Sequence, residues 1–131
     1  MITKRIEIIP VSASRPRVTR RGVFYAKPYN DFKKAFPLLL GAKKLLSGAL
    51  GVYLDFTIPM PKSWSKKKKA EMIFSYHTQK ADIDNYAKAV LDGMNGHFYE
   101  DDSQIAILHV VKRWGNIGSI DIRIDSNDTS N

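Results

Sequence analysis

Polar and apolar residues alternate in several segments of the chain, the pattern of half-buried β-strands. The clearest segment is 51–58, GVYLDFTI, which places Val52, Leu54, Phe56 and Ile58 on one face. We expect further strands at residues 3–9, 18–26 (with its turn at Arg21-Gly22), 104–114 and 119–124. Only the turn at 116–118 separates the last two, so we expect them to pair with each other.

Helical spacing predicts three helical regions. Residues 28–47 should form a helix that is kinked or split at Pro37 and ends at Gly48. Ser63 should cap a short basic helix, and residues 84–95, closed by Gly96, carry an amphipathic one. The expected fold is α+β: one domain over residues 1–131, with a mixed β-sheet packed against helices and a frayed tail at 126–131.

The composition excludes several classes of protein. The 131 residues include no cysteine, which removes disulfide frameworks, thiol nucleophiles and thiolate zinc sites. Three histidines without HExxH spacing argue against a zinc hydrolase of that type. No apolar run approaches the roughly 18 residues of a membrane helix, and the N-terminus lacks a signal-peptide core, so we expect a soluble, cytoplasmic protein.

Charge is divided unevenly along the chain. Residues 1–80 hold 17 Lys and Arg against 4 Asp and Glu, whereas residues 81–131 hold 4 against 9. A pI near 9.7 favours a nucleic-acid partner, although a merely basic surface or a ribosome-associated protein is the alternative. The acids of residues 81–131 would repel an anionic nucleic acid unless their charge were neutralised. A metal ion is the simplest candidate for this.

Six of these nine acids lie in the stretch KADIDNYAKAVLDGMNGHFYEDDSQI, residues 80–105. Asp82 should lie in the extended entry to a helix and Asp84 at its cap, with Lys88 and Asp92 following at four-residue intervals. Carboxylates suit Mg²⁺, and a nearby lysine suits phosphodiester hydrolysis. The alternatives are an N-cap at Asp84, a Lys88–Asp92 surface pair and a solvated turn at 100–102; an EF-hand calcium loop is absent.

The same residues also resemble a known family. DIDNYAKAVLDGMNG followed by EDDSQI resembles the signature of the RusA family of Holliday-junction endonucleases, in the type found in phages and Gram-positive bacteria. Its elements are Asp-x-Asp-Asn, a lysine four residues after the second Asp, a Leu-Asp helix and Asp-Asp-small-Gln. The upstream SRPRVT…GVFY and YHTQKADIDN are also similar, so the likeness spans nearly the whole chain. Ala81 departs from it, where relatives are expected to carry proline.

The resemblance implies a homodimeric, Mg²⁺-dependent enzyme, with Mn²⁺ expected to substitute, that makes paired nicks in four-way DNA junctions. It assigns Asp82, Asp84 and Asp102 as catalytic metal ligands, Lys88 as the catalytic lysine, Asp101 as a possible fourth ligand and Asn85 as support for the acids. Two rival hypotheses are a flap or branched-DNA nuclease without strict junction specificity and a non-catalytic basic DNA-binding protein. A two-fold dimer would match the two-fold symmetry of a four-way junction.

Candidate DNA contacts lie in the basic half. Arginine matches phosphate oxygens bidentately, which favours Arg15, Arg17, Arg20 and Arg21. The run Lys66, Lys67, Lys68 and Lys69 could bind phosphate or be a solvated helix face, and Lys80 and His77 lie beside the acids. Phe24, Tyr25 and Tyr99 could stack on bases, but burial is the simpler expectation, as it is for Trp64 and Trp114.

Overall fold

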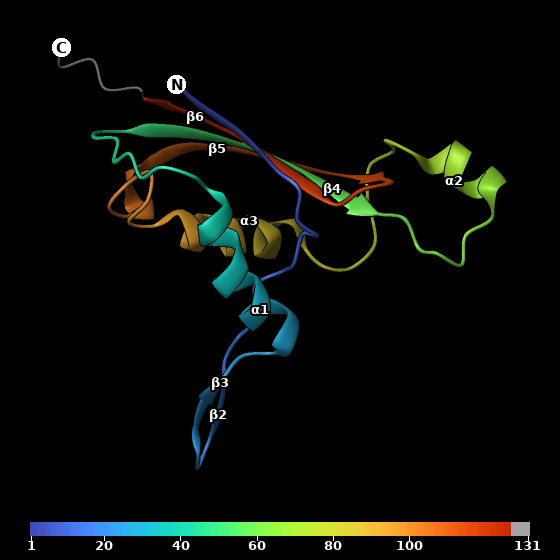
Figure 1. The fold of residues 1–131 in the computed structure, drawn as a ribbon, viewed down its shortest axis with the longest axis horizontal. Coiled ribbons are helices and arrows are strands. Elements are labelled where there is room, and N and C mark those ends of the chain that lie inside the picture. Colours follow the sequence, from blue (N-terminus) through green and yellow to red (C-terminus); the bar gives the residue numbers. More distant parts are fainter. Residues whose placement is uncertain (127–131) are drawn as a thin grey trace.

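A four-stranded mixed sheet forms the centre of the protein (Figure 1). The computed structural model describes residues 1–126. The sheet has the order β1-β6-β4-β5. Strand β4 pairs in parallel with β5 and antiparallel with β6, and β1 pairs antiparallel with β6, which confirms the expected α+β class. The four strands are β1 (Ile2–Ile6), β4 (Leu50–Pro59), β5 (Ile105–Gly115) and β6 (Ser119–Ser126).

The helices α1 (Lys27–Ala35) and α3 (Ile83–Met94) lie on one face of this sheet (Figure 1). As predicted, Val52, Leu54, Phe56 and Ile58 of β4 are buried, because they point towards the helices. Val90 and Met94 of α3 are also fully buried, while Ile83 at the start of α3 is exposed. The prediction from alternation and helical spacing is therefore confirmed for β4 and for most of α3.

The predicted pairing of the last two strands is wrong. Strand β4 lies between β5 and β6 and pairs with both, so neither of its edges is left open. Strands two places apart in a sheet are about 10 Å apart, a gap that the three-residue link 116–118 can span. The link runs tightly against the N-terminal segment, because a Cβ atom on Gly118 would lie 2.8 Å from Cα of Ile9.

The long helix predicted from 28 to 47 is shorter than expected. Helix α1 ends at Ala35, the 3₁₀ helix η1 (Phe36–Leu39) follows, and residues 40–49 are irregular, so Gly48 ends no helix. Pro37 falls in the first turn of η1, where its missing N–H breaks no helical bond, and the predicted split is confirmed.

Two smaller predictions also change. Ser65, rather than Ser63, caps α2 (Lys66–Met72), since its Oγ accepts the N–H of Lys68 at 3.1 Å. The strand expected at 18–26 is a hairpin of β2 (Arg17–Thr19) and β3 (Gly22–Phe24), which projects from the body of the molecule (Figure 1).

Two findings concern the limits of the fold. Within residues 1–126, no helix is both long and apolar enough to cross a membrane. The frayed tail predicted at 126–131 falls almost entirely outside the described residues, and its first residue, Ser126, ends β6.

As expected, Trp114 is buried in the core, and the half-buried Trp64 packs against it with ring centroids 4.8 Å apart.

Candidate active site

The N-terminus of α3 carries two of the predicted carboxylates. Asp82 is the N-cap, with extended backbone at φ −69° and ψ 143°, and Asp84 lies in the first helical turn. Asp82 was expected in the extended entry, which is confirmed, but the cap expected at Asp84 lies two positions earlier, at Asp82 itself. The Asp82 side chain makes no capping hydrogen bond. Both acids therefore lie where the helix dipole stabilises negative charge, and neither forms an ion pair with a described residue.

A cleft of about 790 Å³ runs along the polar face of α3. We call it the α3 cleft. Asp84, Lys88 and Asp92 line it from α3 at four-residue intervals, together with Asn85. The opposite wall comes from elsewhere in the chain: Ala13, Ser14, Arg15, Pro16, Tyr25, Tyr29 and Lys33. The cleft thus joins the basic N-terminal half to the acidic motif, as the division of charge suggested.

Contacts between distant segments hold this opposite wall in place. The Ala13 N–H donates to the Asn85 carbonyl at 2.9 Å, which fixes residues 13–16 against α3. Tyr25 and Tyr29 pack edge to face at 5.4 Å, and Nζ of Lys33 lies 3.8 Å from the centre of the Tyr25 ring. Burial, and next the charge of Asp92, raise the pKa of Tyr29, which therefore stays neutral.

Tyr25, Tyr29 and Lys33 were not identified as cleft residues from the sequence. Tyr29 and Lys33 are four residues apart and share one face of α1, which was the available signal, whereas Tyr25 precedes the helix. It could not show which part of the protein that face meets, because the contact with α3 spans more than fifty residues of sequence.

Lys88 and Asp92 form an ion pair inside the cleft, with Nζ 3.2 Å from a carboxylate oxygen. The hydrogen bond to Asp92 and the charge of Asp92 raise the pKa of Lys88, and the charge of Asp102 adds to this effect. Lys88 is thus a stable cation beside Asp84. Asp92 serves as its partner, so the Lys88–Asp92 pair that the sequence analysis gave as an alternative is present.

In the motif Glu100-Asp101-Asp102-Ser103-Gln104, the two adjacent aspartates differ in their hydrogen bonds. The Asp101 carboxylate accepts the Ser103 N–H at 3.2 Å and caps the short helix η2 (Asp102–Gln104). Hydrogen bonding from Ser103, first from its side chain and next from this N–H, lowers the pKa of Asp101. The Gln104 amide accepts from the N–H groups of Glu100 and Asp101 and donates to the carbonyls of Leu46 and Gly48. The half-buried Asp102 carboxylate has no such bond among the described residues, so it is the freer acid of the two.

The structure does not bring the predicted metal ligands together in one group. Within residues 1–126 there is no cluster of three or more His, Asp or Glu side chains placed to hold a metal ion. Asp84 lines the α3 cleft, but Asp82 and Asp102 are not among its lining residues. The donor chemistry still suits a hard cation, since Asp82 and Asp84 are exposed, unpaired carboxylates on the same helix end and Mg²⁺ usually keeps several waters.

The predicted arginines surround the hairpin. Arg15 lines the α3 cleft, Arg17 lies on β2, and Arg20 and Arg21 form the hairpin turn. All four are exposed. Val18, Val23 and Phe24 of the same hairpin are also exposed, the last at 51%, so the expectation that Phe24 is buried is wrong. Tyr25 is exposed at 36% and Tyr99 is fully buried, which confirms that expectation for Tyr99 only.

The remaining basic candidates lie apart from the hairpin. Lys66, Lys67, Lys68 and Lys69 begin α2, which lies beyond the far end of β4 (Figure 1). Nζ of Lys68 lies 4.4 Å from the Trp64 ring centre. Lys80 is exposed in the segment before α3. His77 is only 4% exposed and packs on Trp114 with ring centroids 4.3 Å apart, so the structure corrects its assignment from a DNA contact to a core residue.

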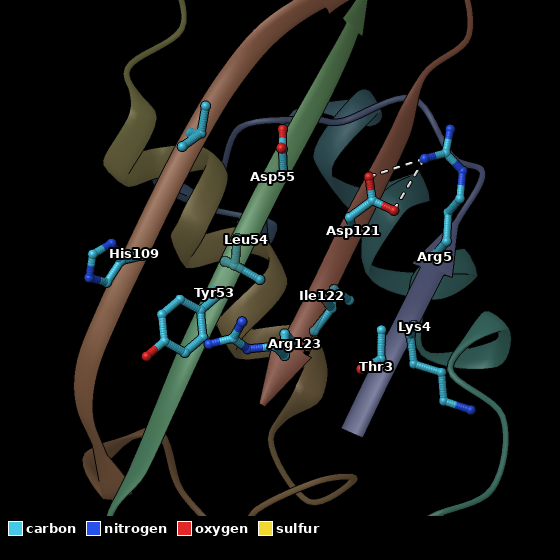
Figure 2. A pocket seen from close by; sticks show the side chains of 11 residues that line it. Thr3, Lys4, Arg5, Tyr53, Leu54, Asp55, His109, Asp121, Ile122 and Arg123 are labelled. Atoms are coloured by element: carbon cyan, nitrogen blue, oxygen red, sulfur yellow. Dashed lines mark hydrogen bonds and ion pairs between the residues drawn. The ribbon is translucent and has the colours of Figure 1, made fainter. Parts of the chain in front are cut away.

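A second hollow, of about 400 Å³, lies on the sheet face that carries no helix (Figure 2). Arg5 pairs with Asp121 at 3.1 Å, and the Arg123 guanidinium lies 4.0 Å from the Tyr53 ring centre (Figure 2). Asp55 pairs with Arg113 at 3.0 Å. These charges neutralise one another, and the hollow holds none of the predicted site residues.

Comparison with known proteins places this arrangement in a family. A family model described as endodeoxyribonuclease RusA matches residues 7–125. A Bacillus subtilis (strain 168) protein named uncharacterized protein YqaN is 33% identical over 126 aligned residues, covering 88% of this chain and 89% of that protein. The matched region contains the α3 cleft, the hairpin and the Asp101–Gln104 cap. The chain belongs to the RusA family of endodeoxyribonucleases.

Proposed function

We propose that this protein is a Mg²⁺-dependent, structure-selective endodeoxyribonuclease that resolves four-way DNA junctions as a homodimer. Family membership supports DNA cleavage. The observation that carries the proposal is the α3 cleft, where the acidic face of α3 meets Arg15 at the base of an exposed arginine hairpin. Such a cleft offers a basic surface to a DNA backbone and carboxylates next to the bound phosphate.

The proposed roles follow from position. Arg15, Arg17, Arg20 and Arg21 bind phosphates along the projecting hairpin, and their contribution to affinity falls steeply with salt. Two-stranded β-ribbons fit DNA grooves, so β2 and β3 provide a suitable shape. The Lys66–Lys69 run and Lys80 extend the basic surface beyond the cleft. The aromatic pair Tyr25 and Tyr29 supports this wall of the cleft.

Asp82, Asp84 and Asp102 are the proposed ligands for Mg²⁺, with Mn²⁺ as a substitute. When bound, the metal activates water and stabilises charge on the phosphate. Lys88 is a cation throughout the neutral pH range and donates hydrogen bonds to a nonbridging phosphate oxygen, where negative charge grows during hydrolysis. Asp92 holds Nζ of Lys88 on the cleft side of α3, and Asn85 fixes residues 13–16 through its carbonyl.

A free strand edge supports the homodimer. Strand β5 lies at the edge of the sheet. Among the described residues, its outer edge forms backbone hydrogen bonds only at residues 112–114, which pair with residues 74–77. Residues 105–111, IAILHVV, carry no Asp, Glu, Lys or Arg, and Ile107 and Leu108 are more than 40% exposed. The opposite edge strand β1 carries Lys4 and Arg5. Neutral apolar edges pair readily with a second strand, whereas charged edges resist pairing.

A plasmid that extrudes a cruciform tests this function. In Mg²⁺, a junction resolvase makes two coordinated nicks and releases a linear product. Single nicks alone, giving open circles, indicate a flap or branched-DNA nuclease without junction symmetry. Binding of the cruciform without any cleavage at millimolar Mg²⁺ indicates a non-catalytic DNA-binding protein.

A further inference from the structure

The Lys112 side chain contacts the segment that leads into the candidate active site. Its Nζ donates to the carbonyl of Gln79 at 3.0 Å and to the carbonyl of Ala81 at 2.9 Å. Ala81 directly precedes Asp82 in the sequence. In the register of the sheet Lys112 is opposite the buried Phe56, so it lies on the face that the helices cover. A lysine in this position links β5 to the start of α3.

No acid neutralises Lys112 within the described part of the chain. Its ammonium forms none of the ion pairs among residues 1–126, and the residue is half-buried. Removing an ammonium from water is costly unless its hydrogen bonds are replaced, and here two carbonyls replace them. A methionine would fill the same space without this cost. The polar contact therefore needs an explanation other than packing.

The segment between His77 and Asp82 has few other anchors. The backbone ladder to β5 ends where the His77 N–H donates to the Lys112 carbonyl at 3.0 Å, and the next backbone bonds are those to the Asp82 carbonyl at the start of α3. Thr78, Gln79 and Lys80 are exposed. Among the hydrogen bonds of the described residues, those from Nζ of Lys112 alone tie residues 78–81 to the rest of the protein.

We infer that Lys112 is a positioning residue for the proposed metal site: its ammonium fixes the segment before α3 and so sets the direction of the Asp82 carboxylate. This inference rests on the proposed role of Asp82 as a ligand. Lys112 itself has no contact with the α3 cleft, because it is not among the lining residues. Its substitution should loosen the Asp82 carboxylate while the cleft wall stays intact.

Mn²⁺ titration followed by electron paramagnetic resonance tests the inference. Lys112→Met should weaken Mn²⁺ binding about tenfold, and Lys112→Arg, which keeps the charge and the donors, should recover most of the affinity. The matched control is Arg113→Met, on the next residue of β5 but on the opposite face, where Arg113 pairs with Asp55. It should leave affinity unchanged. Lys112→Met with Mn²⁺ affinity within twofold of wild type overturns the inference, even though the metal site stands.

A second measurement keeps the inference separable from the metal site. Amide hydrogen exchange of the metal-free protein should speed up over residues 78–83 in Lys112→Met and remain unchanged in Arg113→Met. Wild-type protein that binds no Mn²⁺, or an Asp82→Asn variant with wild-type affinity, contradicts the metal site itself. In that case the exchange rates still decide whether Lys112 fixes the segment, and unchanged rates in Lys112→Met overturn that claim.

Discussion

Lys88 and Asp92 offer a sharp test, because breaking their ion pair has a small expected effect on stability, whereas losing Lys88 has a large expected effect on cleavage. The pair is solvent-accessible, with the Lys88 side chain 63% and the Asp92 side chain 34% exposed. Such i,i+4 pairs contribute about 0.3–0.5 kcal/mol. Breaking the pair in Lys88→Met or Asp92→Asn should therefore lower the melting temperature by only about 2 °C.

The effect on cleavage should differ between the two variants. Losing one donor that stabilises charge in the transition state costs about 10²–10³-fold in rate, so Lys88→Met should cut a four-way junction that much more slowly. Asp92→Asn keeps the lysine and should stay within about tenfold of wild type. Single-turnover cleavage of a labelled junction in Mg²⁺, with binding measured by gel shift, separates rate from affinity.

The reasoning is refuted by either of two results. Lys88→Met that cuts within threefold of wild type shows that the lysine does not stabilise the transition state. Asp92→Asn that binds normally but cuts as slowly as Lys88→Met shows that Asp92 does more than hold Lys88 in place.

Three further predictions concern stability and assembly. Gly93→Ala should lower the free energy of unfolding in urea by about 1–3 kcal/mol, because the added Cβ would lie 2.6 Å from Cδ1 of Phe36. Adding Phe36→Leu should recover part of this loss, and purely additive losses in the double variant contradict the prediction. Burial, and next the charge of Lys112, lower the pKa of His77 below 6.5. As the pH is lowered, the unfolded state therefore takes up a proton before the folded state does, so the melting temperature should decrease as the pH drops below about 6.5. A His77→Gln protein whose melting temperature depends on pH as steeply as that of wild type contradicts this. Leu108→Lys on the free β5 edge should convert the dimer to a monomer in light scattering, whereas Thr3→Lys on the β1 edge should not; a dimeric Leu108→Lys protein excludes this edge as the interface.

Elements whose pattern is local could be predicted from the sequence. Alternation in β4 identified four buried side chains, and helical spacing identified α3, because each pattern is repeated within a few residues. The split at Pro37 followed from the missing N–H of proline. The caps of α2 and α3 each lie two positions from the predicted residue, since Ser63 and Ser65, like Asp82 and Asp84, are equally suitable residues and only the backbone geometry decides between them.

Arrangements that depend on distant residues could not be predicted. The turn at 116–118 is short enough for a hairpin, yet β4 lies between the two strands that it joins. His77 was expected at the DNA surface because it lies close to the acids in sequence, but the backbone bond to Lys112 places it in the core. Neighbours in sequence are not always neighbours at a site.

The site could be predicted in part. The motif identified Asp84, Asn85 and Lys88, which lie together in the α3 cleft, and Arg15, a candidate from the arginine cluster, lines the same cleft. The contribution of Tyr25, Tyr29 and Lys33 depends on the packing of α1 near α3, which no local pattern encodes. Local pattern alone does not separate Asp101 from Asp102, and only the resemblance assigned Asp102 as a ligand and Asp101 as a possible fourth. The capping bond to Ser103 distinguishes them.

Junction cleavage by wild type and Asp82→Asn tests the central claim most directly. The substituted side chain makes no capping hydrogen bond, so the change should leave the fold and the basic surface intact. We expect wild type to cut a four-way junction in Mg²⁺ and to stop when EDTA is added. Asp82→Asn should bind the junction with similar affinity and leave it uncut. An Asp82→Asn protein that cuts at the wild-type rate, or a wild type that leaves the junction intact in Mg²⁺, contradicts the account.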